Sequence, residues 1–357
     1  MVAIVGALVA IGLVMVFSAS SATAYAQHHD IAYFLKRQLL WLALALGCAL
    51  VAYKLEYRVL RKLAPAILVV ALLSLVAVLI PHVGLLSGGA RRWLGAGALS
   101  FQPSEFAKLA LVIYLAAAIA RHHDRIRSLT RGLWPLFTVT FAVAGLILVE
   151  PDMGTASLVV FTAFAMLFVA GARVPHLLAI VLATAPPIAY SILASPYKRA
   201  RIFAFLDPWK DAQNSGFHIV QSLLALGSGG VFGLGLGLSR QKFFYLPEQY
   251  TDFIFAIVGE ELGLIGALFV VALFLFFAYR ATKIALAAPD EFGFFLVVGC
   301  TAIIVVQAFV NIGVTTSSWP VTGVPLPFIS FGGSSLIVSL IAVALILNVG
   351  RSSRRPA

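Results

Sequence analysis

Long runs of apolar residues, separated by short polar links, recur from Val2 to Val349. An α-helix of about 20 residues crosses the roughly 30 Å hydrocarbon core of a bilayer. Together with the turn and charge signals between them, the runs predict ten membrane helices. These lie near residues 2–19, 38–54, 65–82, 103–120, 133–149, 154–171, 176–194, 252–279, 293–316 and 331–350. We therefore expect an all-α integral membrane protein with a single polytopic domain, 1–357, and one long outer loop, 195–251.

Composition strengthens this interpretation, because 61% of the residues are hydrophobic and only 11% are charged. Soluble domains are roughly 45 to 50% apolar. The net charge of +11 would suit a nucleic-acid partner, but the Lys and Arg residues fall in short links between apolar runs, as membrane topology requires. We expect the lipid bilayer as a partner and no nucleic acid. Ala24-Tyr25-Ala26 resembles a signal-peptidase site, yet no basic residue precedes the first run, so a retained helix is expected.

The positions of Lys and Arg also predict the orientation of the chain. Three short segments are rich in them, and together they mark the cytoplasmic side. These residues are Lys54, Arg58, Arg61 and Lys62, then Arg121, Arg125, Arg127 and Arg131, and finally Arg351, Arg354 and Arg355. Both termini are then cytoplasmic, and the unusual polar residues lie at the outward ends of the helices.

Asp252 is predicted to lie at the outer end of a membrane helix, since Tyr245–Ala256 runs directly into an apolar stretch. An ionisable group at that depth is costly unless it is paired or lines a wet cavity, and is a functional candidate by default. The alternative is that Thr251 or Asp252 caps the helix. Glu260 and Glu261 lie two turns deeper, where packing or a buried ion pair is as plausible as catalysis.

A second group of candidates precedes and begins the helix predicted at 103–120. Glu105 and Lys108 stand three residues apart on one helix face, so they can neutralise each other or bind a ligand. Arg92 and Trp93 offer a cationic fork and an aromatic platform suited to phosphate and sugar, although interfacial anchoring explains a Trp equally well.

The predicted outer face carries more cations than topology leads us to expect, which an anionic substrate would explain. They are Lys36, Arg37, Lys198, Arg199, Arg201, Arg240 and Lys242. The glycine-dense segment 224–237 follows no strand, so it predicts a flexible or closely packed re-entrant segment and not a nucleotide loop. The seven histidines form no metal-ligand pattern, and no Ser/His/Asp arrangement is evident.

Five motifs in this order resemble the SEDS family (shape, elongation, division and sporulation) over nearly the whole chain. They are Gln102-Pro-Ser-Glu-Phe-Ala-Lys108, Glu150-Pro-Asp-Met-Gly-Thr155, Leu206-Asp-Pro-Trp209, Leu246-Pro-Glu-Gln-Tyr-Thr-Asp252 and Pro325-Leu-Pro-Phe-Ile-Ser-Phe-Gly-Gly-Ser-Ser335. The segment from Ser239 to Pro247 resembles the division branch more than the elongation branch.

The resemblance implies a ten-helix glycosyltransferase that polymerises lipid II at the septum of the bacterial inner membrane. It also implies a class B penicillin-binding transpeptidase and other division proteins as partners. Asp252 matches the essential aspartate of the family, Glu105 and Lys108 match a pair that lines its cavity, and Asp152 and Glu248 match further acidic positions. Tyr250 departs from the pattern, because the family usually has His there.

The implied mechanism is an inverting transfer with Asp252 as the base. The pyrophosphate leaving group would be neutralised by Lys108, Arg92, loop cations or a divalent ion, Mg²⁺ or Mn²⁺. The alternatives are a lipid II flippase and a scaffold without activity. A flippase should offer polar sites to both leaflets, and a scaffold needs no intramembrane charge, so the outward crowding of acids and bases favours the enzyme.

Overall fold

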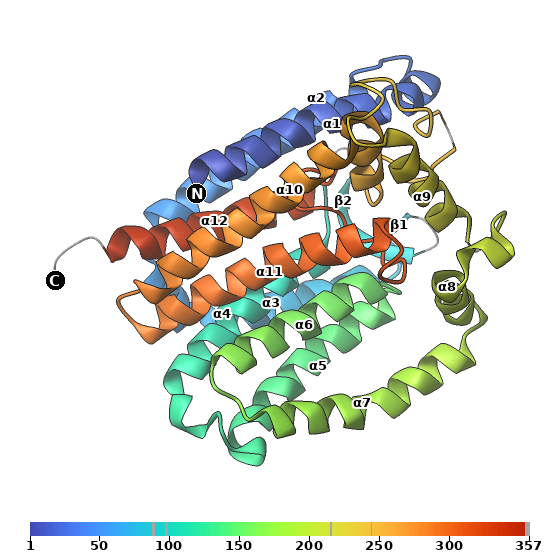
Figure 1. The fold of residues 1–357 in the computed structure, drawn as a ribbon. Coiled ribbons are helices and arrows are strands. Elements are labelled where there is room, and N and C mark those ends of the chain that lie inside the picture. The colour runs from blue at the N-terminus through green and yellow to red at the C-terminus, as the bar shows by residue number, and fades with distance from the viewer. Residues whose placement is uncertain (88–89, 97–98, 215, 244, 354–357) are drawn as a thin grey trace. The chain divides into compact units, whose positions relative to one another are not determined.

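The computed structural model describes residues 1–87, 90–96, 99–214, 216–243 and 245–353. Within these residues the chain is almost entirely helical (Figure 1). The α-helices are α1 (Val2–His28), α2 (Tyr33–Lys54), α3 (Tyr57–Leu79), α4 (Pro103–Arg121), α5 (Trp134–Val149), α6 (Met153–Val169), α7 (Val174–Ala194), α8 (Pro196–Leu206), α9 (Phe217–Gly229), α10 (Ile254–Leu286), α11 (Glu291–Thr315) and α12 (Gly333–Ser352). The strands are β1 (Leu85–Ser87), β2 (Ala90–Ala96) and β3 (Leu99–Phe101), and the short turns are η1 (His123–Arg125), η2 (Leu129–Leu133) and η3 (Pro208–Asp211).

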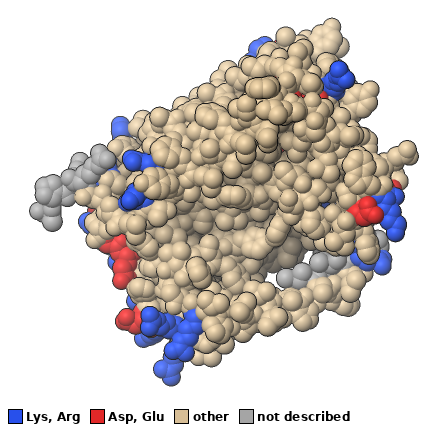
Figure 2. All heavy atoms as spheres, viewed as in Figure 1, with Lys and Arg blue, Asp and Glu red and all other residues tan. Residues whose placement is uncertain are grey.

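A helix occupies each of the ten predicted positions, and the all-α membrane fold is confirmed. Eight stretches of the described residues are long and apolar enough to cross a bilayer, while α6, α7 and α9 contain shorter apolar helices. The total of ten crossings stays a prediction. Large apolar side chains such as Leu73, Leu182 and Phe269 are exposed, as helices in lipid require. Broad uncharged surface separates small groups of charged side chains in Figure 2.

The chain divides into two compact units, each built from three separate stretches. Unit 1 comprises Met1–Trp41, Ile180–Phe277 and Gln307–Gly332, and unit 2 comprises Leu42–Ala179, Ala278–Val306 and Gly333–Ala357. The helices α2, α7, α10 and α11 continue from one unit into the other. The single domain 1–357 and the outer loop 195–251 stay predictions.

Unit 2 is organised around α4, which packs against α3, α5, α6 and α12 and is buried along most of its length (Figure 1). Small side chains such as Ala107, Ala110 and Ala116 allow this close packing. The chain enters α4 from an antiparallel sheet of order β1-β2-β3. In that sheet Trp93 pairs with Leu85, and Leu94 pairs with Phe101.

In unit 1, α10 is interrupted at Gly263 (φ 67°, ψ −169°), where the glycine-dense segment joins it. Backbone N–H groups of Leu234 and Gly235 donate to the carbonyls of Glu260 and Glu261, and Leu264 N–H donates to Gly230. A Cβ on Gly233 would lie 2.2 Å from the Glu261 carbonyl oxygen, so only glycine allows this approach. Of the two predicted forms of segment 224–237, close packing is therefore correct.

Candidate functional site

Asp252 is held by its main chain, two residues before α10 begins. Three successive carbonyl groups each accept a hydrogen bond from another part of unit 1. The Tyr250 carbonyl accepts from Phe331 N–H (2.9 Å), the Thr251 carbonyl from Ser330 Oγ (2.5 Å) and the Asp252 carbonyl from Asn311 Nδ2 (2.7 Å). We call these three bonds the carbonyl anchor. The anchor fixes the Asp252 backbone while its side chain stays partly exposed.

The anchor extends through α11 and the irregular segment 320–332. Asn311 Nδ2 also donates to the Val324 carbonyl (2.8 Å), and Gln307, one turn earlier on the same face, donates to the Pro325 carbonyl (2.9 Å). Irregular backbone in a membrane protein needs such internal partners. Gly323 lies so close to Asp252 that a Cβ built there would be 3.5 Å from its Oδ2. The segment therefore lines the carboxylate.

Glu248, Arg201 and His218 complete the described surroundings of this segment. The Thr251 hydroxyl donates to the Glu248 carboxylate (2.7 Å), and the His218 ring stacks on Phe253 with 5.8 Å between centroids. Burial lowers the pKa of His218, and the positive charge of Arg201 lowers it further. The negative charge of Glu248 partly opposes this shift. Arg201 Nη1 donates to the Val321 carbonyl (3.1 Å). Lys198 lies on α8, and its side chain is outside the described residues.

Lys242 requires a correction. It was predicted to be one of several cations exposed to an anionic substrate, but its side chain is buried. The ammonium donates to the Gly237 carbonyl and lies 3.4 Å from Glu261 Oε1. Glu260 accepts from Ser239 Oγ and from Arg240 N–H, and Ser18 Oγ donates to Glu261. A buried polar network thus ties the loop after the glycine-dense segment to α1 and α10, which supports the ion-pair interpretation of Glu261.

In unit 2, Glu105 and Lys108 form the pair that their spacing predicts. Lys108 Nζ lies 2.8 Å from Glu105 Oε1, and the two side chains are 2% and 3% exposed. Two charges this deeply buried are stable only when they neutralise each other. The pair lies in the first two turns of α4.

Gln102, Arg92 and Asp152 meet at the same end of unit 2. Asp152 caps α6 by accepting from Thr155 N–H (2.9 Å) and from its hydroxyl (2.8 Å), and it also accepts from Gln102 Nε2 (3.3 Å). Arg92 donates to the Glu150 carbonyl (2.9 Å) and the Pro151 carbonyl (2.5 Å), while Trp93 beside it is partly exposed. These contacts give Arg92 and Asp152 structural roles.

The Glu150 carboxylate is buried, and neither of its oxygens has a hydrogen-bond partner in the described structure. Burial, together with the neighbouring Asp152 charge, raises the pKa of Glu150 to about 8. Arg92 opposes this rise. Glu150 is therefore mainly protonated at neutral pH.

Sequence reasoning did not find Asn311, Ser330 or His218. Asn311 carried a usable signal, because Gln307, Asn311 and Thr315 place polar groups at i, i+4 and i+8 on one face of an apolar helix. His218 lies within the predicted outer loop, 195–251, and no sequence pattern links it to Asp252. Among the described residues, no group of three or more His, Cys, Asp or Glu side chains is arranged to hold a metal ion.

The profile of the FtsW/RodA/SpoVE family, described as cell cycle proteins, matches residues 1–355. The chain belongs to this family. Stage V sporulation protein E of Bacillus subtilis is 45% identical over 347 residues, which cover 97% of this chain and 95% of that protein. The probable peptidoglycan glycosyltransferase FtsW of Trichlorobacter lovleyi is 44% identical, covering 96% and 90%. The predicted SEDS membership, close to FtsW, is confirmed.

Solved structures agree with the FtsW/RodA/SpoVE assignment. A chain of a peptidoglycan synthase complex, described as coordinating polymerisation and crosslinking, is 32% identical with a TM-score of 0.81, covering 99% of this chain and 98% of that one. The rod shape determining protein RodA of Thermus thermophilus is 31% identical with a TM-score of 0.71, covering 99% and 97%. The family fold therefore extends over nearly the whole chain.

Proposed function

We propose that this chain, a multi-pass peptidoglycan glycosyltransferase of the inner membrane, polymerises lipid II at the outer face with Asp252 as general base. The glycosyltransferase activity is supported by the 44% identity to proteins named FtsW over nearly the full length. The carbonyl anchor carries the assignment of Asp252, because it holds the backbone of a partly exposed carboxylate at one place. Catalytic groups need such positioning.

In the proposed step, Asp252 takes the proton from the 4-hydroxyl of an N-acetylglucosamine. That oxygen forms a bond to C1 of an N-acetylmuramic acid, and the bond from C1 to undecaprenyl pyrophosphate breaks. The leaving group carries away the electron pair, and Asp252 later releases the proton to water. An α-linked donor gives a β-linked product, so a single displacement with one base is sufficient.

The negative charge of the departing pyrophosphate needs a cation. Arg201 is our candidate in unit 1, because it is partly exposed and a guanidinium has five donors to share between the Val321 carbonyl and a phosphate. Lys198, one turn earlier on α8, is proposed alongside it. In unit 2, we keep the partly exposed Arg92 and Trp93 as candidate substrate contacts. Glu105, Lys108 and Asp152 are buried, so we propose that they support the substrate-binding residues from within the protein.

Among the described residues, no three His, Cys, Asp or Glu side chains are arranged to hold a divalent cation. Mg²⁺ is often held by one or two carboxylates together with substrate phosphates. Measuring the polymerisation rate during a titration with EDTA tests whether such an ion binds together with the substrate.

We further propose a class B penicillin-binding transpeptidase as partner, since a similar solved chain belongs to a complex of polymerisation and crosslinking. We also propose that the chain works with other division proteins, that it lies at the septum and that both of its termini are cytoplasmic. The cytoplasmic termini follow from the distribution of Lys and Arg.

The decisive experiment measures glycan strands made from purified lipid II by the chain with its transpeptidase. Wild type is compared with Asp252→Asn and with a matched control, Asp30→Asn, which removes a carboxylate from a surface ion pair of the same unit. We expect strands from wild type and the control alone. Strands from Asp252→Asn would exclude Asp252 as the base. No strands from any variant, with lipid II translocation across vesicles by the wild type, would favour a flippase.

A further inference from the structure

Unit 2 has a cavity of about 550 Å³ at the end of α4 that lies opposite the Glu105–Lys108 pair. Arg121 is the last residue of α4, so sixteen residues, about 24 Å of helix, separate it from Glu105. The cavity thus lies at the face that the Lys and Arg distribution predicts to be cytoplasmic. It is separate from every residue proposed to act in the glycosyl transfer.

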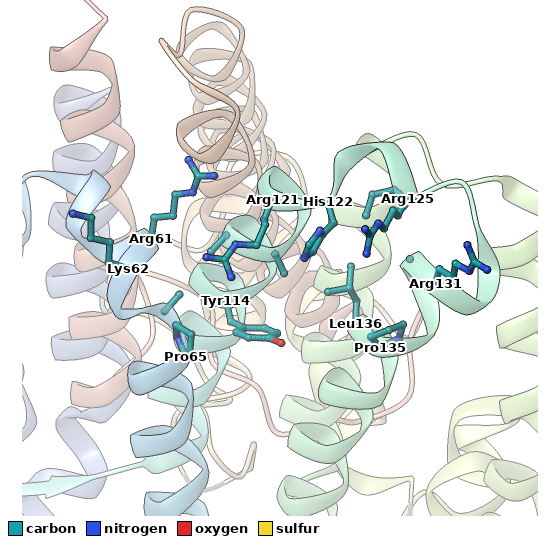
Figure 3. A pocket seen from close by; sticks show the side chains of 15 residues that line it. Arg61, Lys62, Pro65, Tyr114, Arg121, His122, Arg125, Arg131, Pro135 and Leu136 are labelled. Carbon is teal, nitrogen blue, oxygen red and sulfur yellow. The ribbon is translucent and has the colours of Figure 1, made fainter.

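Five cationic side chains line this cavity, and they come from four different elements (Figure 3). They are Arg61 and Lys62 of α3, Arg121 of α4, Arg125 of η1 and Arg131 of η2. None of the described lining residues is acidic, and none of the five cations forms an ion pair in the described structure. In Figure 3, Arg121 lies between the cations of α3 and those of the turns. Five like charges around one cavity repel one another unless an anion joins them.

The floor and walls of the cavity are apolar. Ala64, Pro65, Ala118, Ile126 and Leu136 line it together with Tyr114, which lies between Pro65 and Leu136 in Figure 3. A cavity with cations and apolar walls complements a molecule that has an anionic head and hydrocarbon chains. Basic pockets of this kind between membrane helices, on the cytoplasmic side, bind the head groups of anionic lipids.

The turns that carry Arg125 and Arg131 have a compact, built structure. Ser128 caps η2, a π-helical turn, and Gly132 packs so closely that a Cβ there would lie 1.9 Å from the Arg125 carbonyl oxygen. Ile126, between them in the sequence, is buried. A loop whose only task was to anchor topology by charge would not need this geometry, since such anchoring depends only on the number of cations near the membrane.

We propose that this cavity binds the phosphodiester head group of an anionic phospholipid from the adjacent leaflet. The guanidinium groups of Arg121, Arg125 and Arg131 contact the phosphate, since arginine forks match phosphate oxygens. The acyl chains leave between Pro65 of α3 and Leu136 of α5, which line the cavity from two sides (Figure 3). The inference does not depend on the proposed catalytic function, and its test uses binding and not polymerisation.

The experiment measures lipid binding to the purified full chain by native mass spectrometry and by thermal stabilisation. The probes are phosphatidylglycerol, phosphatidylcholine and soluble glycerol phosphate. We expect wild type to prefer phosphatidylglycerol over phosphatidylcholine by at least about tenfold. Both lipids carry a phosphodiester, but the choline ammonium of phosphatidylcholine cancels the phosphate charge and is repelled by the five cations that line the cavity. The variant Arg121→Gln/Arg125→Gln/Arg131→Gln should lose this preference.

The matched control, Arg127→Gln/Arg173→Gln/Arg280→Gln, removes three cations from the same predicted face but outside the cavity, and should keep the preference. A second variant, Ala118→Trp, keeps every charge and fills the cavity floor, so it should also lose the preference even if the triple variant fails to fold. The proposal would be overturned if the control lost the preference for phosphatidylglycerol to the same extent, or if Ala118→Trp bound phosphatidylglycerol like wild type. If glycerol phosphate stabilised the protein as much as phosphatidylglycerol does, the ligand would be a soluble phosphate compound and the lipid proposal would be wrong.

Discussion

Asn311→Leu tests whether the carbonyl anchor positions the base. Asn311 donates to the carbonyls of Asp252 (2.7 Å) and Val324 (2.8 Å), and leucine has a similar volume but no donor. Each of the two carbonyls that loses its donor costs about 1 to 3 kcal/mol. The anchor is therefore weakened by several kcal/mol. A displacement of about 1 Å at a reacting group lowers the rate by about a hundredfold.

We expect the polymerisation rate of Asn311→Leu to fall by about 30- to 100-fold, with a small change in the lipid II concentration at half-maximal rate. The control is Thr315→Val on the same face of α11, where the Thr315 hydroxyl donates, among the described residues, to the helix carbonyls of Asn311 and Ile312. Ser330→Ala removes the donor to Thr251 and should also slow the reaction. Wild-type rates in both Asn311→Leu and Ser330→Ala, with intact folding, would refute the positioning argument.

Three further predictions concern stability, measured as the Tm of the purified chain. Lys108→Met should lower stability by about 3 to 5 kcal/mol because it leaves Glu105 buried and unpaired, while Glu105→Gln/Lys108→Met should recover most of the loss; an equal loss in both would contradict a neutralising pair. Between pH 4.5 and about 8 the unfolded Glu150 carboxyl is ionised and the folded one is protonated, so stability falls across this window. The stability of Glu150→Gln relative to wild type should accordingly increase from pH 5 to pH 8 and then level off. A stability difference that does not change with pH would exclude Glu150 as the cause of the pH dependence. Gly233→Ala should be strongly destabilising because of its φ of 82° and the contact with Glu261, whereas Gly227→Ala in α9, with open space around it, should change stability by less than about 1 kcal/mol.

Helix positions were predictable because each apolar run is long, but several ends were not. The first helix was expected to stop at residue 19, yet α1 continues to His28 because Ser18, Ser20 and Thr23 are buried against the protein, with Ser18 bonded to Glu261. The third was expected to begin at Pro65, which instead lies inside α3. Polar residues and proline end helices in water, but inside a packed membrane protein neighbouring groups can satisfy them.

The strands β1 to β3 and the helices α8 and α9 were not predicted, since short elements carry little periodic signal. The Glu105–Lys108 pair was predictable because both residues lie on one helix turn. The hydrogen bonds that hold Asp252 were not, because their donors, including Asn311 and Ser330, lie about 60 to 80 positions away along the chain. The burial of Lys242 likewise depends on Glu261, which its own sequence neighbourhood does not reveal.

The carbonyl anchor has a consequence for which of its positions tolerate substitution. All three acceptors are main-chain oxygens, which every amino acid possesses, so the side chain at position 250 does not determine where Asp252 lies. Tyr250 can therefore stand where the family resemblance leads us to expect histidine, and pack against Phe34 and Phe331 without moving the carboxylate. The donors at 311 and 330 are side chains, and a library randomised at these three positions should recover many residues at 250 and very few at 311.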